Sequence, residues 1–174
     1  MTCGVDESTS FVQWLVANAG GRLVGRTRIQ KTSYIIQYLG FSKCEFDFAY
    51  RHYGPYSESF ASAVEAAVAL RKVTEINRKS NWGSMYSEYT VEKSIVDYSS
   101  PPELQEVIKF LASSNAIHLE LAATALFLAD MGHDNPWNET AERKPEKSDF
   151  IEPAKLMYSR LRGLSGAQSL PKLN

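Results

Sequence analysis

The chain has 174 residues, the length of one domain that can bury an ordinary core without disulfide bonds. Its hydrophobic fraction of 44% and charged fraction of 22% are typical of a globular protein and exclude a disordered chain. The 19 Lys and Arg residues nearly balance the 20 Asp and Glu residues, so the net charge draws the chain neither to nucleic acid nor to anionic lipid.

The cysteines and the apolar runs indicate a cytoplasmic protein. The two cysteines, Cys3 and Cys44, have no spacing that suggests a metal or redox site, and we expect both to be free thiols in a reducing compartment. The N-terminal residues lack the basic and apolar regions of a signal peptide. The longest apolar run, residues 119–131, is interrupted by Glu120 and Asp130 and is too short for a bilayer, so we expect no membrane contact.

Residues 8–92 predict a winged-helix-like half. Ser8 can cap a helix over 9–18, and Thr27 can cap a second helix that ends near Leu39. Alternating residues predict a strand over 46–51, and Ser57 is placed to cap a helix over 58–72. Residues 73–78 and 85–91 then form a hairpin. The strand that usually lies between the first two helices of a winged helix is not expected here.

Residues 100–164 predict a helical bundle on which the first half packs. Ser100 and two prolines begin one helix, and residues 117–131 form a helix that is apolar nearly all round and therefore central. A short turn near 134–137, a polar loop over 143–148 and a last helix over 150–164 follow. The whole is one mainly helical α+β domain, with a flexible tail at 165–174.

No catalytic, metal or cofactor site is predicted. The three histidines, His52, His118 and His133, have no shared helical face and no cysteine pair beside them. The serines lie in caps and loops rather than in a nucleophile elbow, and the glycines lack the lysine and spacing of a phosphate loop. An enzyme would need a deep pocket that joins distant polar residues.

Four aromatic residues are candidates for contact with a protein partner: Tyr53, Tyr56, Trp82 and Tyr86. Tyrosine supplies rigid contact area, but the tyrosines near Gly54 can equally pack against the second helix. Trp82 lies in a polar hairpin loop, where binding and packing explain it equally well.

Binding to DNA is the alternative that the winged-helix order raises. The third helix would enter the major groove, yet it begins with Glu58 and contains Glu65, and its basic residues come only at its end. A weak basic patch is possible at the start of the second helix, from Arg22, Arg26, Arg28 and Lys31.

Two segments resemble a known family. Residues 25–34, with Gln30 and Lys31, precede residues 50–57, with Gly54 and Pro55. This order is similar to the YwgA-like family of poorly characterised bacterial proteins and, more remotely, to the Panacea (SocA-like) antitoxin domain. Residues 131–137, which contain His133 and Trp137, resemble that domain's His-x-x-x-Trp segment.

The resemblance implies a domain that neutralises a toxin by direct binding or delivers a client protein to a protease. The six matching residues named above are then mainly architectural: Gly54 and Pro55 set a turn, and His133 and Trp137 lock a loop. We therefore expect a non-catalytic protein-binding module whose partner is a toxin or a client protein. A winged-helix transcription regulator is the alternative.

Overall fold

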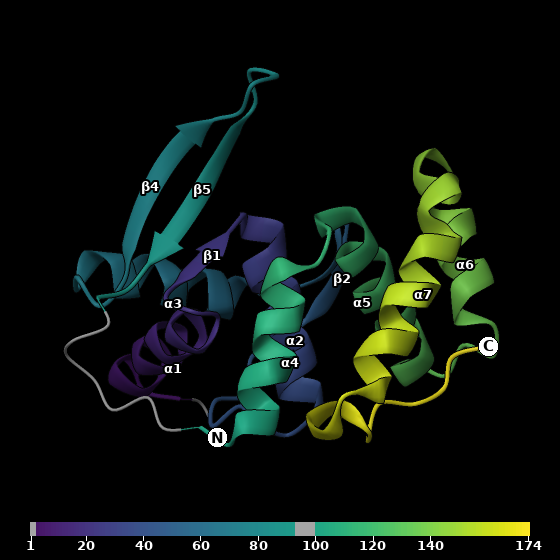
Figure 1. Cartoon of the computed structure of the whole chain (residues 1–174), viewed down its shortest axis with the longest axis horizontal. Coiled ribbons are helices and arrows are strands. Elements are labelled where there is room, and N and C mark those ends of the chain that lie inside the picture. The colour runs from purple at the N-terminus through teal and green to yellow at the C-terminus, as the bar shows by residue number, and fades with distance from the viewer. Residues whose placement is uncertain (1–2, 93–99) are drawn as a thin grey trace.

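The computed structural model of the chain describes residues 3–92 and 100–174, and its first half has the winged-helix order. The elements of this half, shown in Figure 1, are α1 (Val5–Asn18), β1 (Arg22–Val24), α2 (Arg26–Tyr38), β2 (Ala49–Arg51), β3 (Gly54–Tyr56), α3 (Glu58–Ala69), β4 (Thr74–Lys79) and β5 (Met85–Thr90). A strand does lie between α1 and α2, contrary to the expectation from sequence. It was missed because three residues are too few to show alternation.

Three strands of the winged-helix half form one antiparallel sheet in the order β1-β5-β4, and β2 and β3 form a separate two-stranded sheet. β1 pairs only with the last part of β5, from Glu88 to Thr90, whereas β4 pairs with β5 along its full length. Leu23 and Tyr89 are paired across the β1–β5 ladder, and both are buried in the core. The outer part of the hairpin therefore has no third strand.

The second half is helical and shares its core with the first. It contains α4 (Pro102–Ser113), α5 (Ala116–Asp130), α6 (Pro136–Arg143), the 3₁₀ helix η1 (Pro145–Phe150), α7 (Ile151–Gly163) and the 3₁₀ turn η2 (Ser165–Ala167). As expected, α5 is central: it packs against α2, α6 and α7 (Figure 1). Its side chains are buried on nearly all sides. One hydrophobic cluster spans both halves.

The helix starts differ in part from those expected. α1 begins at Val5 rather than after Ser8, because the Glu7 side chain accepts a hydrogen bond from the Gly4 amide, 3.1 Å away. α2 begins after Gly25 without a side-chain cap, so Thr27 lies inside the helix. Ser57 is confirmed as the cap of α3, since its hydroxyl accepts from the Phe60 amide at 3.1 Å.

The segment expected as a strand over 46–51 forms a strand only at its end, in β2. Phe46 lies outside β2 and packs between the rings of Phe11 and Phe60, with ring centroids 5.6 and 5.1 Å away. Gly54 and Pro55 do not form the turn. They belong to β3, which pairs with β2, and the residues between the strands form the turn. Hydrophobic burial, rather than ladder pairing, thus positions the first half of this segment.

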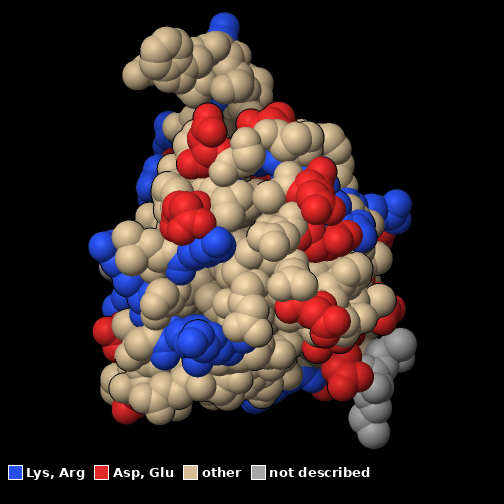
Figure 2. Space-filling view, turned by 90° about the vertical axis from the view of Figure 1, so that its right-hand side faces the viewer, with Lys and Arg blue, Asp and Glu red and all other residues tan. Residues whose placement is uncertain are grey.

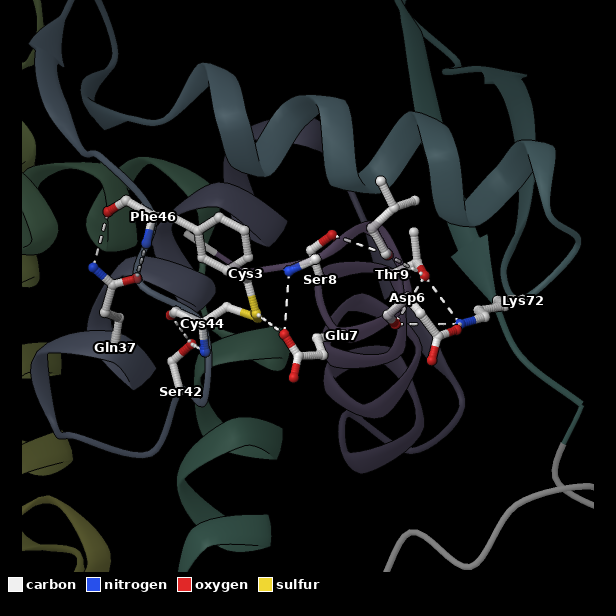
Figure 3. The surroundings of a disulfide bond; sticks show 12 residues. Cys3, Asp6, Glu7, Ser8, Thr9, Gln37, Ser42, Cys44, Phe46 and Lys72 are labelled. Carbon is white, nitrogen blue, oxygen red and sulfur yellow. Dashed lines mark hydrogen bonds and ion pairs between the residues drawn. A yellow bond between two sulfur atoms is a disulfide. The ribbon is translucent and has the colours of Figure 1, made fainter. Parts of the chain in front are cut away.

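The two cysteines are not free thiols. Cys3 and Cys44 form a disulfide, which ties the segment before α1 to the loop after α2 (Figure 3). Cys44 is buried, and the nearby Gln37 side chain donates to and accepts from the backbone of Phe46. The spacing of the cysteines did not indicate this bond, because they are 41 positions apart in the sequence and meet only after the chain between them has folded back.

The segment after α7 is packed rather than loose. Leu170 is buried, the Tyr158 hydroxyl donates to the Pro171 carbonyl at 2.8 Å, and Arg162 donates to the Leu170 carbonyl at 3.0 Å. Gly166 lies against the backbone of Glu103 in α4, where a Cβ atom would come within 2.8 Å of the carbonyl oxygen. The expected flexible tail at 165–174 is therefore wrong, because its few apolar side chains cover the core.

In the part of the chain that the structure describes, no single helix has the length and apolarity needed to cross a membrane. Only α4 and α5 taken together reach that length and composition, and they meet at a bend of 118°.

Candidate partner-binding surface

The β4–β5 hairpin, which we call the wing, extends away from the body of the molecule (Figure 1). Its last cross-strand pair is Lys79 with Met85, and β1 reaches along β5 only as far as Glu88. The six residues of β4 are nearly all exposed, and Ile76 exposes 40% of its surface. Residues 81–85 at the outer end of the wing are therefore exposed, whereas Tyr86 is half-buried and Ser87 is buried beside the start of α2.

Trp82 is at the tip of the wing and is 95% exposed. Met85, at the start of β5, is 64% exposed. In Figure 2 the tip projects above the rest of the molecule and consists mostly of uncharged side chains. The packing explanation for Trp82 does not apply, because its indole covers no core.

The turn that carries Trp82 is closed by its own hydrogen bonds. The Ser80 amide donates to the Ser84 carbonyl at 2.8 Å, and the Gly83 amide donates to the Ser80 carbonyl at 2.9 Å. The two serine hydroxyls are 2.8 Å apart, and the Ser84 amide donates to the Ser80 hydroxyl at 3.1 Å. Gly83 has a φ of 85°, a backbone conformation that favours glycine. The turn is thus fixed without support from the body.

The charged side chains in the outer part of the wing are all basic. Residues 76–87 contain Arg78 and Lys79 but no Asp or Glu. Arg78 and Arg22 hold the carboxylate of Glu88, with nitrogen–oxygen distances of 2.9 and 2.7 Å. Hydrogen bonds from Arg22 and then Arg78 lower the pKa of Glu88 to about 2. Lys79 has no ion pair among the described residues, so it remains available to a partner.

Two hollows lie at the base of the wing, and Arg26 lines both. The larger, about 400 Å³, lies between the start of α2 and Met85, Tyr86 and Ser87 of β5. The smaller, about 100 Å³, is lined by Tyr56, Tyr89 and residues of α3. Tyr56 and Tyr86 are both half-buried and line different hollows. Of the predicted contact residues, only Tyr86 shares the wing with Trp82.

Tyr53 belongs to another surface. It lies in the β2–β3 turn and is 54% exposed. The Lys147 ammonium, from η1, lies 5.2 Å from the centroid of its ring, and the His52 ring lies 4.7 Å away. The predicted set of four aromatic contact residues is therefore not one patch.

Gln30 and Lys31 attach α2 to the segment after β2. The Gln30 side-chain amide donates to the Ser57 carbonyl at 3.0 Å and accepts from the Ser57 backbone amide at 3.1 Å. These two hydrogen bonds satisfy the Ser57 backbone as a neighbouring strand would. Lys31 is 1% exposed and donates to the Pro55 carbonyl at 2.7 Å. Burial lowers the pKa of Lys31 to about 8. Both side chains thus fix the backbone rather than face solvent.

Gly54 lies where a side chain cannot be accommodated. Its φ is 81°, and a Cβ atom there would lie 2.2 Å from the Thr124 hydroxyl of α5. Trp137 is buried and stacks edge-on against Tyr158, with ring centroids 6.0 Å apart. His133 donates its backbone amide to the Leu128 carbonyl at 3.0 Å, at the end of α5.

A buried charged cluster was not found from the sequence. The Glu120 carboxylate, on α5, lies 2.9 Å from the Lys144 ammonium and 2.6 Å from that of Lys147. Lys144 is 2% exposed and also donates to the His52 carbonyl. The signal was present, because a carboxylate within a helix that is apolar nearly all round is expected to be buried and then needs a cation. The cluster holds the β2–β3 turn against α5 and η1.

The basic patch expected at the start of α2 is engaged within the molecule. Arg22 pairs with Glu88, Arg26 pairs with Glu75 at 3.4 Å, and Lys31 is buried as described. Arg28 donates to the Ser114 carbonyl at 3.1 and 3.0 Å and also to the Val24 carbonyl. These side chains hold α2 to the sheet and to α4, so little free positive charge faces solvent there.

Among residues 3–92 and 100–174, no group of three or more His, Cys, Asp or Glu side chains could share a metal ion. The tip of the wing thus brings together the Trp82 indole, the Met85 thioether and the Lys79 ammonium, at a turn that is closed by its own hydrogen bonds. Comparisons with protein-family models, with curated proteins and with solved structures find no match to this chain.

Proposed function

We propose that this protein acts by binding another protein, in the manner of an antitoxin or of an adaptor that delivers a client to a protease. The observation that carries the proposal is the 95% exposure of Trp82 on a self-bonded turn. Tryptophan is the residue type most often found at the energetic centre of protein interfaces. The resemblance of residues 25–34 and 50–57 to the YwgA-like and Panacea families supports the same kind of function.

The gain from covering Trp82 is large enough to matter. Burying about 200 Å² of an aromatic side chain at about 25 cal/mol per Å² releases roughly 5 kcal/mol before the entropy cost of association. The fold itself gains nothing from this indole, since the indole covers no core residue.

Purification of the tagged full chain from its native organism tests the proposal. We expect one protein to co-elute in fixed stoichiometry. Expressed alone, that protein should inhibit growth, with the inhibition relieved by this chain, or its half-life should shorten when this chain is present. Absence of a stoichiometric partner, or a partner whose toxicity and half-life are both unchanged, would overturn the proposal.

A DNA-binding regulator is the second candidate, because β1 lies between α1 and α2 and completes the winged-helix order. The exposed side of α3 argues against it. Glu58 and Glu65 are both exposed there, and carboxylates repel the phosphates that a recognition helix must approach. A gel-shift assay with upstream DNA at two salt concentrations discriminates: retention that weakens steeply with salt would favour this candidate over protein binding.

A further inference from the structure

We infer that the partner presents an apolar pocket bordered by carboxylates, which Trp82 and Met85 enter while Lys79 pairs with the border. This inference rests on the proposed function and specifies the chemistry of the partner. It concerns the tip of the wing, where the three side chains lie within seven residues of each other in the sequence.

The backbone of the tip is preorganised by the hydrogen bonds of its own turn. Four hydrogen bonds between Ser80, Gly83 and Ser84 close the turn, as described above. Little backbone entropy therefore remains to be lost when a partner covers it, and preorganisation of this kind strengthens binding. A flexible loop with the same residues would lose more entropy on binding.

The arrangement of the side chains predicts an apolar contact with a charged border. Lys79 and Met85 are directly opposite in the β4–β5 register, so their side chains share one face of the hairpin. Trp82 lies beyond them at the tip, with 95% of its surface free, against 64% for Met85. A pocket that accepts both apolar groups must approach Lys79 closely, and carboxylates at its edge would match that charge.

The charge count favours a protein over a nucleic acid or a membrane. Arg78 is held by Glu88, which leaves Lys79 as the cation without an ion pair among the described residues of the wing. Anionic membranes and nucleic acids are recognised through several clustered cations. A single lysine beside two apolar groups fits the edge of a protein pocket better.

Photocrosslinking in the native cell tests the surface directly. The photoreactive residue p-benzoylphenylalanine replaces Trp82 in the full chain, and the control carries it in place of Leu156, an exposed residue of α7. We expect one protein to be crosslinked from position 82 and not from position 156, through a peptide near Asp or Glu residues. Equal crosslinking from both positions, no crosslink, or a crosslink to nucleic acid or lipid would overturn the inference.

Affinity measurements with the crosslinked protein then separate the side chains. We expect Trp82→Ala to weaken binding by about 30-fold or more, and Lys79→Glu by about fivefold with a smaller effect at high salt. The controls Leu156→Ala and Lys109→Glu, which change exposed residues elsewhere, should bind as the wild type does. If the partner binds the wild type and the affinity of Trp82→Ala is within twofold of the wild-type affinity, the tip of the wing is not the binding surface, while the proposed function stands. If no partner exists, both fail.

Discussion

Breaking the Cys3–Cys44 disulfide should lower the free energy of unfolding by about 4 kcal/mol, from the loop-closure entropy of the 41-residue separation. The native fold should survive reduction, because the loop after α2 is also held by packing of Phe46 against Phe11 and Phe60. The effect therefore lies mainly in the unfolded chain, which gains conformations when the bond is absent. For a domain with a typical stability of about 5–15 kcal/mol, this is a large share.

Urea unfolding, followed by far-ultraviolet circular dichroism with and without reductant, measures the difference. Alkylation and mass spectrometry establish the thiol state of each sample. Cys3→Ser is the matched variant, and without reductant it should unfold as the reduced wild type does. The change is made at Cys3 because Cys44 is 1% exposed, and a serine there would bury a hydroxyl.

Two results would refute this reasoning. One is alkylation of both cysteines in the non-reduced protein. The other is a difference below about 1 kcal/mol between oxidised and reduced forms, since that would mean that the unfolded chain gains little freedom.

Three further predictions concern buried groups. Glu120→Ala should lower the free energy of unfolding by about 3–5 kcal/mol in a urea titration, because it leaves buried ammonium groups without a carboxylate. The control Glu152→Ala, which removes an exposed ion pair, should lower it by under about 1 kcal/mol. Equal losses in the two variants would contradict this prediction. Tyr34→Phe should leave the free energy of unfolding unchanged or raise it, because the buried Tyr34 hydroxyl has no hydrogen-bond partner among the described residues. Tyr158→Phe should lower it by about 1 kcal/mol, because the Tyr158 hydroxyl donates a hydrogen bond to the Pro171 carbonyl. A loss in Tyr34→Phe as large as that in Tyr158→Phe would count against this prediction. The pKa of Glu88 is about 2 in the folded chain against 4.5 normally, so its contribution to stability is complete above pH 4.5 and is lost as the pH falls toward 2. In Glu88→Gln, the free energy of unfolding should therefore fall less steeply with decreasing pH between 4.5 and 2. An unchanged pH dependence in this variant would show that Glu88 does not contribute to it.

Local patterns predicted most of the elements. The apolar stripe of α4, the all-round apolarity of α5 and the cap at Ser57 each depend on residues within a few positions of one another. The β4–β5 hairpin was predicted for the same reason, and with it the position of Trp82 in a polar loop. Periodicity and capping are local physics, so one sequence suffices to recognise them.

The candidate surface was only partly predictable. The sequence placed Trp82 in a loop, but only the structure decided that its indole covers nothing and that Tyr53 lies over η1 instead. Exposure depends on which distant segments come near a side chain, and the wing is exposed because β1 ends before reaching its outer part.

The sequence by itself determined most of the helices, the hairpin and the balance of charge, because these follow from composition and from neighbours along the chain. It did not predict α6 or η1, which replace the expected turn near 134–137 and the expected loop over 143–148. The tertiary structure alone decided the Cys3–Cys44 bond, the use of Gln30 as a substitute strand pairing and the neutralisation of Glu120 by two lysines. Each of these joins residues that are 24 or more positions apart. Such contacts form only after the core has brought the helices together, so no local pattern encodes them.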